Sequence, residues 1–189
     1  MLCHKLIAFA VLSLMLLQLH QVNSEATCGK NFTKVADKCL LASNQWYTWY
    51  EADRYCHSLG AALLSLQNQA ELLQIEKWLS VSVPFKLSEF WTSGNTLGKK
   101  GVYFWQSTGE VARFLPWYPD EPKPASGDCL SLYPKEYNTT FGYSDYRLMI
   151  KSCTYPSPLV CEKQPQKYDN TSSMLCLKPE SYENAQVLL

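Results

Sequence analysis

Histidine is scarce in this chain of 189 residues, and two common kinds of protein site depend on it. The sequence has three histidines, and only His57 lies beyond the apolar N-terminal stretch. Ser-His and Cys-His nucleophilic sites need a histidine as general base. Zinc sites need closely spaced cysteine or histidine pairs, and the sequence contains no C-x-x-C pair. These absences argue against triad-type catalysis and against a zinc protein.

The chain also lacks an excess of charge of either sign. Its 17 lysines and arginines balance 17 aspartates and glutamates. A protein that binds nucleic acid or an anionic membrane over a broad surface usually carries a net positive charge. We therefore expect a partner that is recognised by shape and local chemistry, and no nucleic-acid partner.

No apolar run approaches the length of about 20 residues that a membrane span requires. The nearest to it, Leu6 to Leu17, follows the basic residue Lys5 and precedes small residues ending at Ser24. This arrangement is typical of a cleaved secretion signal. We expect residues 1–24 to be a signal peptide and the mature protein to be extracellular, with no membrane span.

The cysteines indicate a disulfide framework. Cys3 falls in the expected signal peptide, and seven cysteines follow it: Cys28, Cys39, Cys56, Cys129, Cys153, Cys161 and Cys176. In an oxidising compartment six of these would pair in the domain and one would be left over. The spacing alone does not choose among the many possible pairings. Cys176, in a polar C-terminal stretch, is the candidate for an intermolecular disulfide and hence a linked dimer.

Two helices are predicted between residues 48 and 80. In the first, Thr48 and Glu51 form a capping box, and Gly60 stands where a left-handed C-cap belongs. In the second, Asn68 is the N-cap and Glu71 follows it three residues later. The apolar residues at helical spacing are Trp49, Ala52, Cys56 and Leu59 in the first helix, and Leu72, Ile75 and Leu79 in the second.

Short aromatic or alternating segments predict strands on either side of these helices. A small hairpin is expected between Cys28 and Cys39, and further strands at 61–66, 90–94, 102–105, 129–133 and 159–162. Between Trp105 and Cys129 the chain is rich in proline and irregular, and long loops of this kind are often functional. Residues 164–189 are polar without apolar periodicity, so we expect a flexible tail.

The order and spacing of these residues resemble the C-type lectin-like domain, and especially its small secreted arthropod members. The matching residues are Cys39, Trp49-x-x-Ala52-x-x-x-Cys56, Gly60-Ala61-x-Leu63, Phe90-Trp91-Thr92-Ser93-Gly94, Trp105, Trp117-x-x-x-Glu121-Pro122, Asp128-Cys129-Leu130, Cys153 and Val160-Cys161-Glu162.

This resemblance implies an α+β fold over residues 25–163, in which two helices flank a small antiparallel sheet beneath a long irregular upper loop. It also implies the disulfides Cys28–Cys39, Cys56–Cys161 and Cys129–Cys153. Pro122 is implied to be cis, and Trp49, Trp91 and Trp105 to be structural.

The resemblance also implies a calcium-dependent sugar site, but most of its ligand positions are altered here. The family's Glu-Pro-Asn triplet is Glu121-Pro122-Lys123, and the acid two residues before a cysteine is Gly127. Counting back from Cys153, the family's Trp-Asn-Asp positions hold Leu148, Met149 and Ile150. Calcium requires six to eight oxygen ligands, and an ammonium at position 123 would repel it. We expect no bound cofactor and no metal site, with Glu121 as a vestige.

Two alternatives stay open for this region. An insertion before Cys153 would make Tyr143-Ser144-Asp145 a displaced version of the ligand triplet. Ligands could also bind without metal, through aromatic stacking and hydrogen bonds to mixed charges. The candidate ligand-binding residues are Trp117, Tyr118, Asp120, Glu121 and Lys123, although the resemblance implies that Trp117 belongs to the core.

The sequence thus predicts a secreted binding protein that recognises a glycan or a glycoprotein, with the calcium site lost. The alternative is a protein-binding module without sugar activity. A more remote alternative is a hydrolase that uses the carboxylates of Asp120, Glu121 and Asp128. The sequons at Asn31, Asn138 and Asn170 predict exposed, glycosylated positions.

Overall fold

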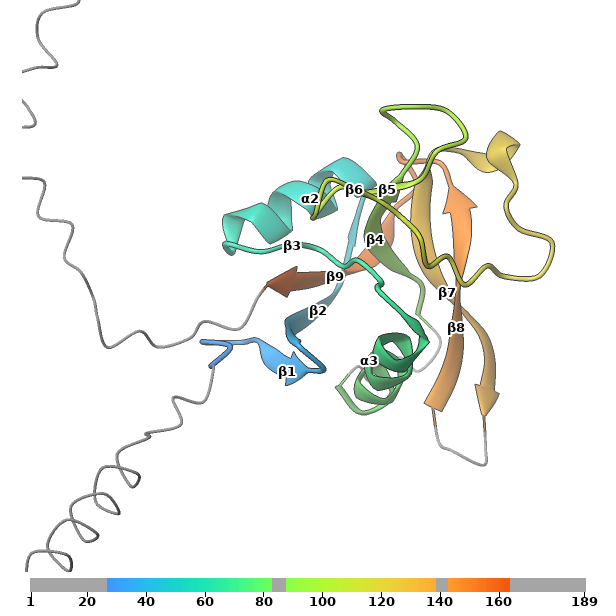
Figure 1. Ribbon diagram of the computed structural model, residues 1–189. Coiled ribbons are helices and arrows are strands. Elements are labelled where there is room, and N and C mark those ends of the chain that lie inside the picture. Colours follow the sequence, from blue (N-terminus) through green and yellow to red (C-terminus); the bar gives the residue numbers. More distant parts are fainter. Residues whose placement is uncertain (1–26, 83–87, 139–142, 164–189) are drawn as a thin grey trace, which may run out of the picture. The chain divides into compact units, whose positions relative to one another are not determined.

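The computed structural model describes residues 27–82, 88–138 and 143–163. The predicted signal peptide and the predicted tail lie outside the described residues, as do Cys176 and Asn170, and they stay predictions. The described part forms one compact unit from Cys28 onward (Figure 1).

The unit is an α+β fold built on one sheet with two helices, as predicted. The helices are α2 (Trp49–Ser58) and α3 (Gln69–Ser82), and a 3-10 turn, η1, spans Pro124–Ser126. The strands are β1 (Thr33–Val35), β2 (Lys38–Tyr47), β3 (Ala62–Leu63), β4 (Phe90–Asn95), β5 (Phe104–Trp105), β6 (Glu110–Val111), β7 (Cys129–Asn138), β8 (Tyr143–Lys151) and β9 (Ser157–Lys163).

The sheet runs in the order β1-β2-β9-β4-β5-β6, with β7 paired to β4 and β8 paired to β7. All of these pairs are antiparallel except β4 with β9, which is parallel, so the sheet is mixed rather than purely antiparallel. Helix α2 packs beside β3 and β9, and α3 packs against β8 and β1 (Figure 1).

Helix α2 begins at the predicted capping box. The Glu51 amide donates to Thr48 Oγ1 at 3.4 Å, and the Thr48 amide donates to Glu51 Oε2 at 2.9 Å. Gly60 has φ of +64°, the left-handed conformation expected of a residue that ends a helix. Leu59 was predicted to belong to the apolar stripe of this helix. It is instead the C-cap residue and is exposed.

Helix α3 also follows the prediction at its start. The Glu71 amide donates to Asn68 Oδ1 at 2.9 Å, and Leu72, Ile75 and Leu79 are buried. The unexpected feature is that two acids of this helix, Glu71 and Glu76, are buried as well. The 3.6-residue period of apolar residues does not signal buried acids, because their partners come from other elements.

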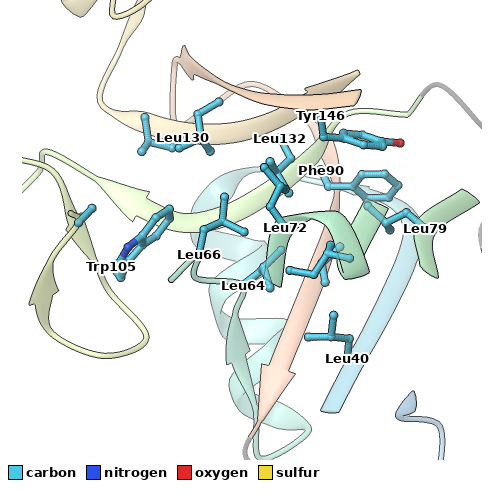
Figure 2. Packing of buried hydrophobic residues seen from close by; sticks show 14 of the residues in the cluster. Leu40, Leu64, Leu66, Leu72, Leu79, Phe90, Trp105, Leu130, Leu132 and Tyr146 are labelled. Carbon is cyan, nitrogen blue, oxygen red and sulfur yellow. The ribbon is translucent and has the colours of Figure 1, made fainter. Parts of the chain in front are cut away.

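The α3 stripe forms the larger hydrophobic cluster with residues of the sheet. Figure 2 shows Leu72 and Leu79 facing Leu132, Phe90 and Tyr146. A second cluster surrounds the disulfides and contains Trp49 and Trp91, whose indole nitrogens donate to the carbonyls of Thr92 and Tyr47 at 2.8 and 2.9 Å. Trp105 is buried in the first cluster. These three tryptophans are structural, as expected.

Some predicted strand boundaries were wrong. The predicted strand 61–66 is regular only at Ala62–Leu63, and the predicted strand 102–105 only at Phe104–Trp105. Leu64 is still bonded on both sides, to the Val160 carbonyl and from the Ser93 amide. The long hairpin of β7 and β8 was missed beyond Tyr133.

Three disulfides join the unit: Cys28–Cys39, Cys56–Cys161 and Cys129–Cys153. These are the pairings that the family resemblance implies. Cys56–Cys161 connects α2 to β9, and Cys129–Cys153 connects the start of β7 to the turn after β8. The disulfide Cys129–Cys153 thus holds the end of the long irregular loop to the chain that follows β8.

Glu76 ties α3 to strand β8. Its Oε1 accepts a hydrogen bond from the Tyr146 amide at 2.9 Å, and Arg147 Nη1 lies 3.7 Å away. Burial raises the pKa of Glu76 to about 7, against the opposing effect of the Tyr146 hydrogen bond. Arg147 lies closer to Asp145 than to Glu76, with 2.5 Å between its Nη1 and Asp145 Oδ1. Glu76 therefore keeps its proton up to near-neutral pH while its carbonyl oxygen still accepts from the strand.

Candidate functional site

The long loop is held against strand β8 by its own backbone. Trp117 forms an isolated parallel bridge with Leu148, in which the Tyr118 amide donates to the Leu148 carbonyl at 2.9 Å. The Leu148 amide donates to the Pro116 carbonyl at 2.8 Å. Since Leu148 is a buried core residue, this bridge connects the loop to the hydrophobic core, and the loop passes alongside β7 and β8 (Figure 1).

Two aromatic candidates of the loop face different neighbours. Trp117 is half-buried, packs on the core cluster, and meets the Tyr103 ring edge-on at 5.0 Å between centroids. Tyr118 is half-buried and meets the Tyr133 ring edge-on at 5.5 Å. Trp117 is therefore mainly a packing residue, whereas Tyr118 extends an aromatic surface onto β7.

Glu121 directs its carboxylate onto the backbone. Its Oε2 accepts from the Lys123 amide at 2.7 Å and from the Ile150 amide at 3.4 Å. The Glu121–Pro122 bond is cis, as the resemblance implies. The neighbouring candidates Asp120 and Lys123 are both exposed, and Asp120 has φ of +65°. The described residues contain no ion pair between the side chains of Glu121 and Lys123.

Position 127 has no room for a side chain. Gly127 has φ of +146° and ψ of −157°, a region that is essentially restricted to glycine. A Cβ there would lie 2.2 Å from the Lys151 carbonyl oxygen. The acid that the family places at this position therefore cannot occur on this backbone without a shift of β8.

Of the three family positions counted back from Cys153, Ile150 lies beside Glu121, because the Ile150 amide donates to the Glu121 carboxylate. Their side chains offer no oxygen ligand, and Leu148 and Ile150 are buried in the core. Asp145, from the displaced alternative, lies five residues earlier on β8, or about 16 Å along a strand. There it pairs with Arg147. The displaced triplet is thus at the wrong end of the strand.

Asp128, the other acid of this region, is also engaged by protein groups. It forms a salt bridge with Lys100 and accepts from Thr96 Oγ1 at 2.7 Å. The hydrogen bonds from Lys100 and Thr96 lower the pKa of Asp128. Burial raises the pKa of the Tyr103 phenol, and the negative charges of Glu121 and Asp128 raise it further.

The donor set of the loop does not fit calcium. Glu121 and Asp128 are already bound by protein groups, and the remaining family positions carry glycine, lysine and apolar residues. Across residues 27–82, 88–138 and 143–163, no group of three or more His, Cys, Asp or Glu is arranged to hold a metal ion. Calcium needs six to eight oxygens, and the described residues of the loop do not supply them.

The loop acids show no arrangement for hydrolysis either. Asp120 is exposed, Glu121 is turned onto amide groups, and Asp128 is paired with Lys100. His57 is exposed on α2, with its Nδ1 2.8 Å from the Asp53 carbonyl oxygen. Neither a carboxylate pair poised around a substrate nor a histidine-activated nucleophile is found in the described part of the chain.

Sequence reasoning missed an aromatic pocket on the flank of the loop. Trp46, Tyr133 and Tyr155 line it, together with Glu89. Trp46 lies at the polar end of β2, beside Asn44 and Gln45, and a tryptophan among polar residues was the available signal. The other lining residues come from three distant segments, which no local pattern connects.

Comparison with known families decides the classification of this fold. The model of the lectin C-type domain matches residues 45–163, more than half of the chain. The chain belongs to the C-type lectin domain family. The match includes the long loop, the β7–β8 hairpin, and two of the three disulfides.

This C-type lectin domain resembles insect proteins in sequence. It is 31% identical to C-type lectin 37Da of Drosophila melanogaster over 117 residues, which are 60% of this chain and 62% of that protein. It is 36% identical to C-type lectin 37Db of the same organism over 102 residues, 53% of this chain and 65% of that protein. The chain therefore spans less than two thirds of the length of these relatives.

Solved structures show the same fold at lower identity. Human lithostathine aligns with a TM-score of 0.60 at 21% identity, covering 73% of this chain and 91% of that one. The carbohydrate-recognition domain of the mouse scavenger receptor C-type lectin aligns with a TM-score of 0.60 at 18% identity, covering 74% and 98%. At this identity the likeness establishes the fold alone.

The family model describes a lectin C-type domain, and the first relatives named above are C-type lectins. Among the helices of the described residues, none has both the length and the apolar character needed to cross a membrane. The comparisons thus establish a C-type lectin-like domain.

Proposed function

We propose that this protein is secreted and recognises a glycan or a glycoprotein without calcium. The observation that carries the proposal is the state of the family's calcium positions: Gly127 has no space for an acid, and Glu121 accepts from two backbone amides. A ligand set can be lost by substitution alone. Here the backbone of Lys151 also occupies the space that a side chain at position 127 would need.

Secretion is supported by the N-terminal pattern and by the compartment that three disulfides require. It is also supported by a relative named salivary C-type lectin 2, from Aedes albopictus, which is 27% identical over 126 residues. Asn31, the described sequon residue nearest the N-terminus, is exposed, as glycosylation requires.

Calcium is expected to leave the stability of the protein unchanged. If a millimolar site existed, tens of millimolar calcium would raise the free energy of unfolding by about 2 kcal/mol, or several degrees in melting temperature. The measurement is thermal unfolding in calcium, in magnesium and in EDTA, together with a printed glycan array probed in calcium and in EDTA.

We expect equal melting temperatures and equal array signals in all conditions. A saturable rise with calcium that magnesium does not reproduce would contradict the proposal. So would array binding that disappears in EDTA.

A protein-binding module without sugar activity is the second candidate, and the exposed tyrosine and tryptophan side chains favour it as much as they favour a glycan. Binding to a glycoprotein that persists after its glycans are removed, and that free hexoses do not inhibit, would favour this candidate. A carboxylate-based hydrolase has no further support from the described geometry.

Cys176 would link two chains through an intermolecular disulfide, because the six other cysteines beyond the expected signal peptide are paired. Linkage of two weak sites would raise avidity. Non-reducing electrophoresis should show a band of twice the monomer mass that Cys176→Ser removes. A monomer band in both proteins would overturn this.

A further inference from the structure

A pocket of about 260 Å³ is lined by none of the residues at the family's calcium positions. Its lining includes three aromatic side chains, Trp46, Tyr133 and Tyr155, and three smaller or polar ones, Glu89, Ser157 and Pro158. These residues come from the end of β2, the chain before β4, strand β7, and the turn that leads into the start of β9. The pocket is thus built where four segments meet.

Two of the aromatic walls are open to solvent. Trp46 is 66% exposed and Tyr155 is 45% exposed. Exposed aromatic rings gathered around a hollow mark ligand sites more often than exposed rings that stand alone. Tyr133 adds a third ring, and its edge-on contact with Tyr118 continues the aromatic surface to the long loop.

Lys151 holds this pocket in shape from outside its lining. Its Nζ lies 3.1 Å from Glu89 Oε2, 4.6 Å from the Tyr155 ring centroid and 5.6 Å from the Tyr133 ring centroid. One ammonium therefore contacts a carboxylate and two rings of the lining, through an ion pair and two cation–π contacts. These contacts fix the walls before any ligand arrives.

The same contacts determine which net charge of a ligand suits the pocket. Lys151 neutralises Glu89, so neither an anion nor a further cation finds an unpaired charge there. Glu89 Oε1 has no hydrogen-bond donor among the described residues although it is buried. A ligand hydroxyl would supply that donor after a small rotation of Glu89, which the single ion pair through Oε2 permits.

We propose that this pocket holds one neutral sugar ring of a glycan, without metal. A hexopyranose has an apolar face that stacks on aromatic rings and a rim of hydroxyl groups that donate to a carboxylate. The volume lies just below the range of about 300–1,000 Å³ typical of drug-sized ligands, which suits one ring rather than an extended chain. This inference rests on the proposed function, for which it supplies the place of contact.

The test follows the indole N–H signal of Trp46 by NMR in the full chain, in EDTA. Trp46→Phe assigns the signal. The probes are the methyl glycosides of mannose, galactose, glucose and N-acetylglucosamine. At least one should shift the Trp46 signal saturably, and Tyr155→Ala should weaken that glycoside's binding about tenfold. Tyr50→Ala is the matched control, because Tyr50 is 43% exposed and lies on α2 outside the pocket.

The outcomes separate this inference from the proposed function. If the glycan array is positive in EDTA but no glycoside shifts Trp46, the pocket is wrong while metal-free recognition stands. If array binding requires calcium, the proposed function fails, and a Trp46 shift in EDTA would still support the pocket. Equal weakening by Tyr155→Ala and Tyr50→Ala would overturn the pocket.

Discussion

Replacing both Cys56 and Cys161 by alanine is expected to destabilise the protein by about 5 kcal/mol. The disulfide closes a loop with a sequence separation of 105 residues, and on the chain-entropy model a loop of this length restricts the unfolded state by about that amount. Since domains are stable by about 5–15 kcal/mol in all, we expect most of the variant to be unfolded or retained in the cell. Urea unfolding and secreted yield measure the effect.

Cys28→Ala with Cys39→Ala is the matched control. That disulfide spans a sequence separation of only 11 residues, for which the same model gives about 3 kcal/mol. Cys56 and Cys161 are also fully buried in the second hydrophobic cluster, so their loss removes packing as well. If the two double variants lost equal stability, loop length would not be the source of the effect.

Replacing Lys38 by methionine is expected to cost about 3–5 kcal/mol, the range for breaking a buried ion pair from one side. Its Nζ lies 3.0 Å from Glu71 Oε1 and 2.7 Å from Glu162 Oε2, and it donates to the Ser65 carbonyl at 2.7 Å. The side chains of the three charged residues are 7–10% exposed. Methionine keeps the length of the side chain but leaves two carboxylates close together without a cation.

Two further variants test the cause of this loss. In the triple variant Lys38→Met, Glu71→Gln and Glu162→Gln, the charges are gone, and part of the stability should return. Lys100→Met is the matched control, because Lys100 pairs with Asp128 but its side chain is 80% exposed, and such pairs contribute about 1 kcal/mol or less. Urea unfolding compares the variants. A Lys38→Met loss no larger than that of Lys100→Met would refute the argument.

The helices were predictable because their signals are local. The capping box at Thr48, the cap at Asn68 and the glycine at position 60 act within four residues of chain, and the structure has all three. The α+β class and the cysteine pairs were implied by the resemblance to the C-type lectin-like domain, whose matching residues extend across the domain. Strand ends were less accurate, because the segment after Leu63 is held by bonds from Val160 and Ser93 that no local pattern shows.

For the loop residues, too, the residue types were predictable from the sequence, whereas their contacts were not. The residue types at 123 and 127 already predicted a lost ligand set. That Gly127 has no space beside Lys151, and that the Glu121 carboxylate accepts from Ile150, depends on how the loop packs on β8. Asp128 likewise has its partner 28 residues away, at Lys100.

The order of residues along the chain determined the helices and the residue types at the family's calcium positions, since each depends on residue type and short-range spacing. Folding decided the cluster of Lys38 with Glu71 and Glu162, the buried position of Glu76, and the pocket of Trp46, Tyr133 and Tyr155. These features join residues that are 22 to 124 positions apart. Contacts at such separations arise from the packing of whole elements, which is a property of the sheet and not of any segment in it.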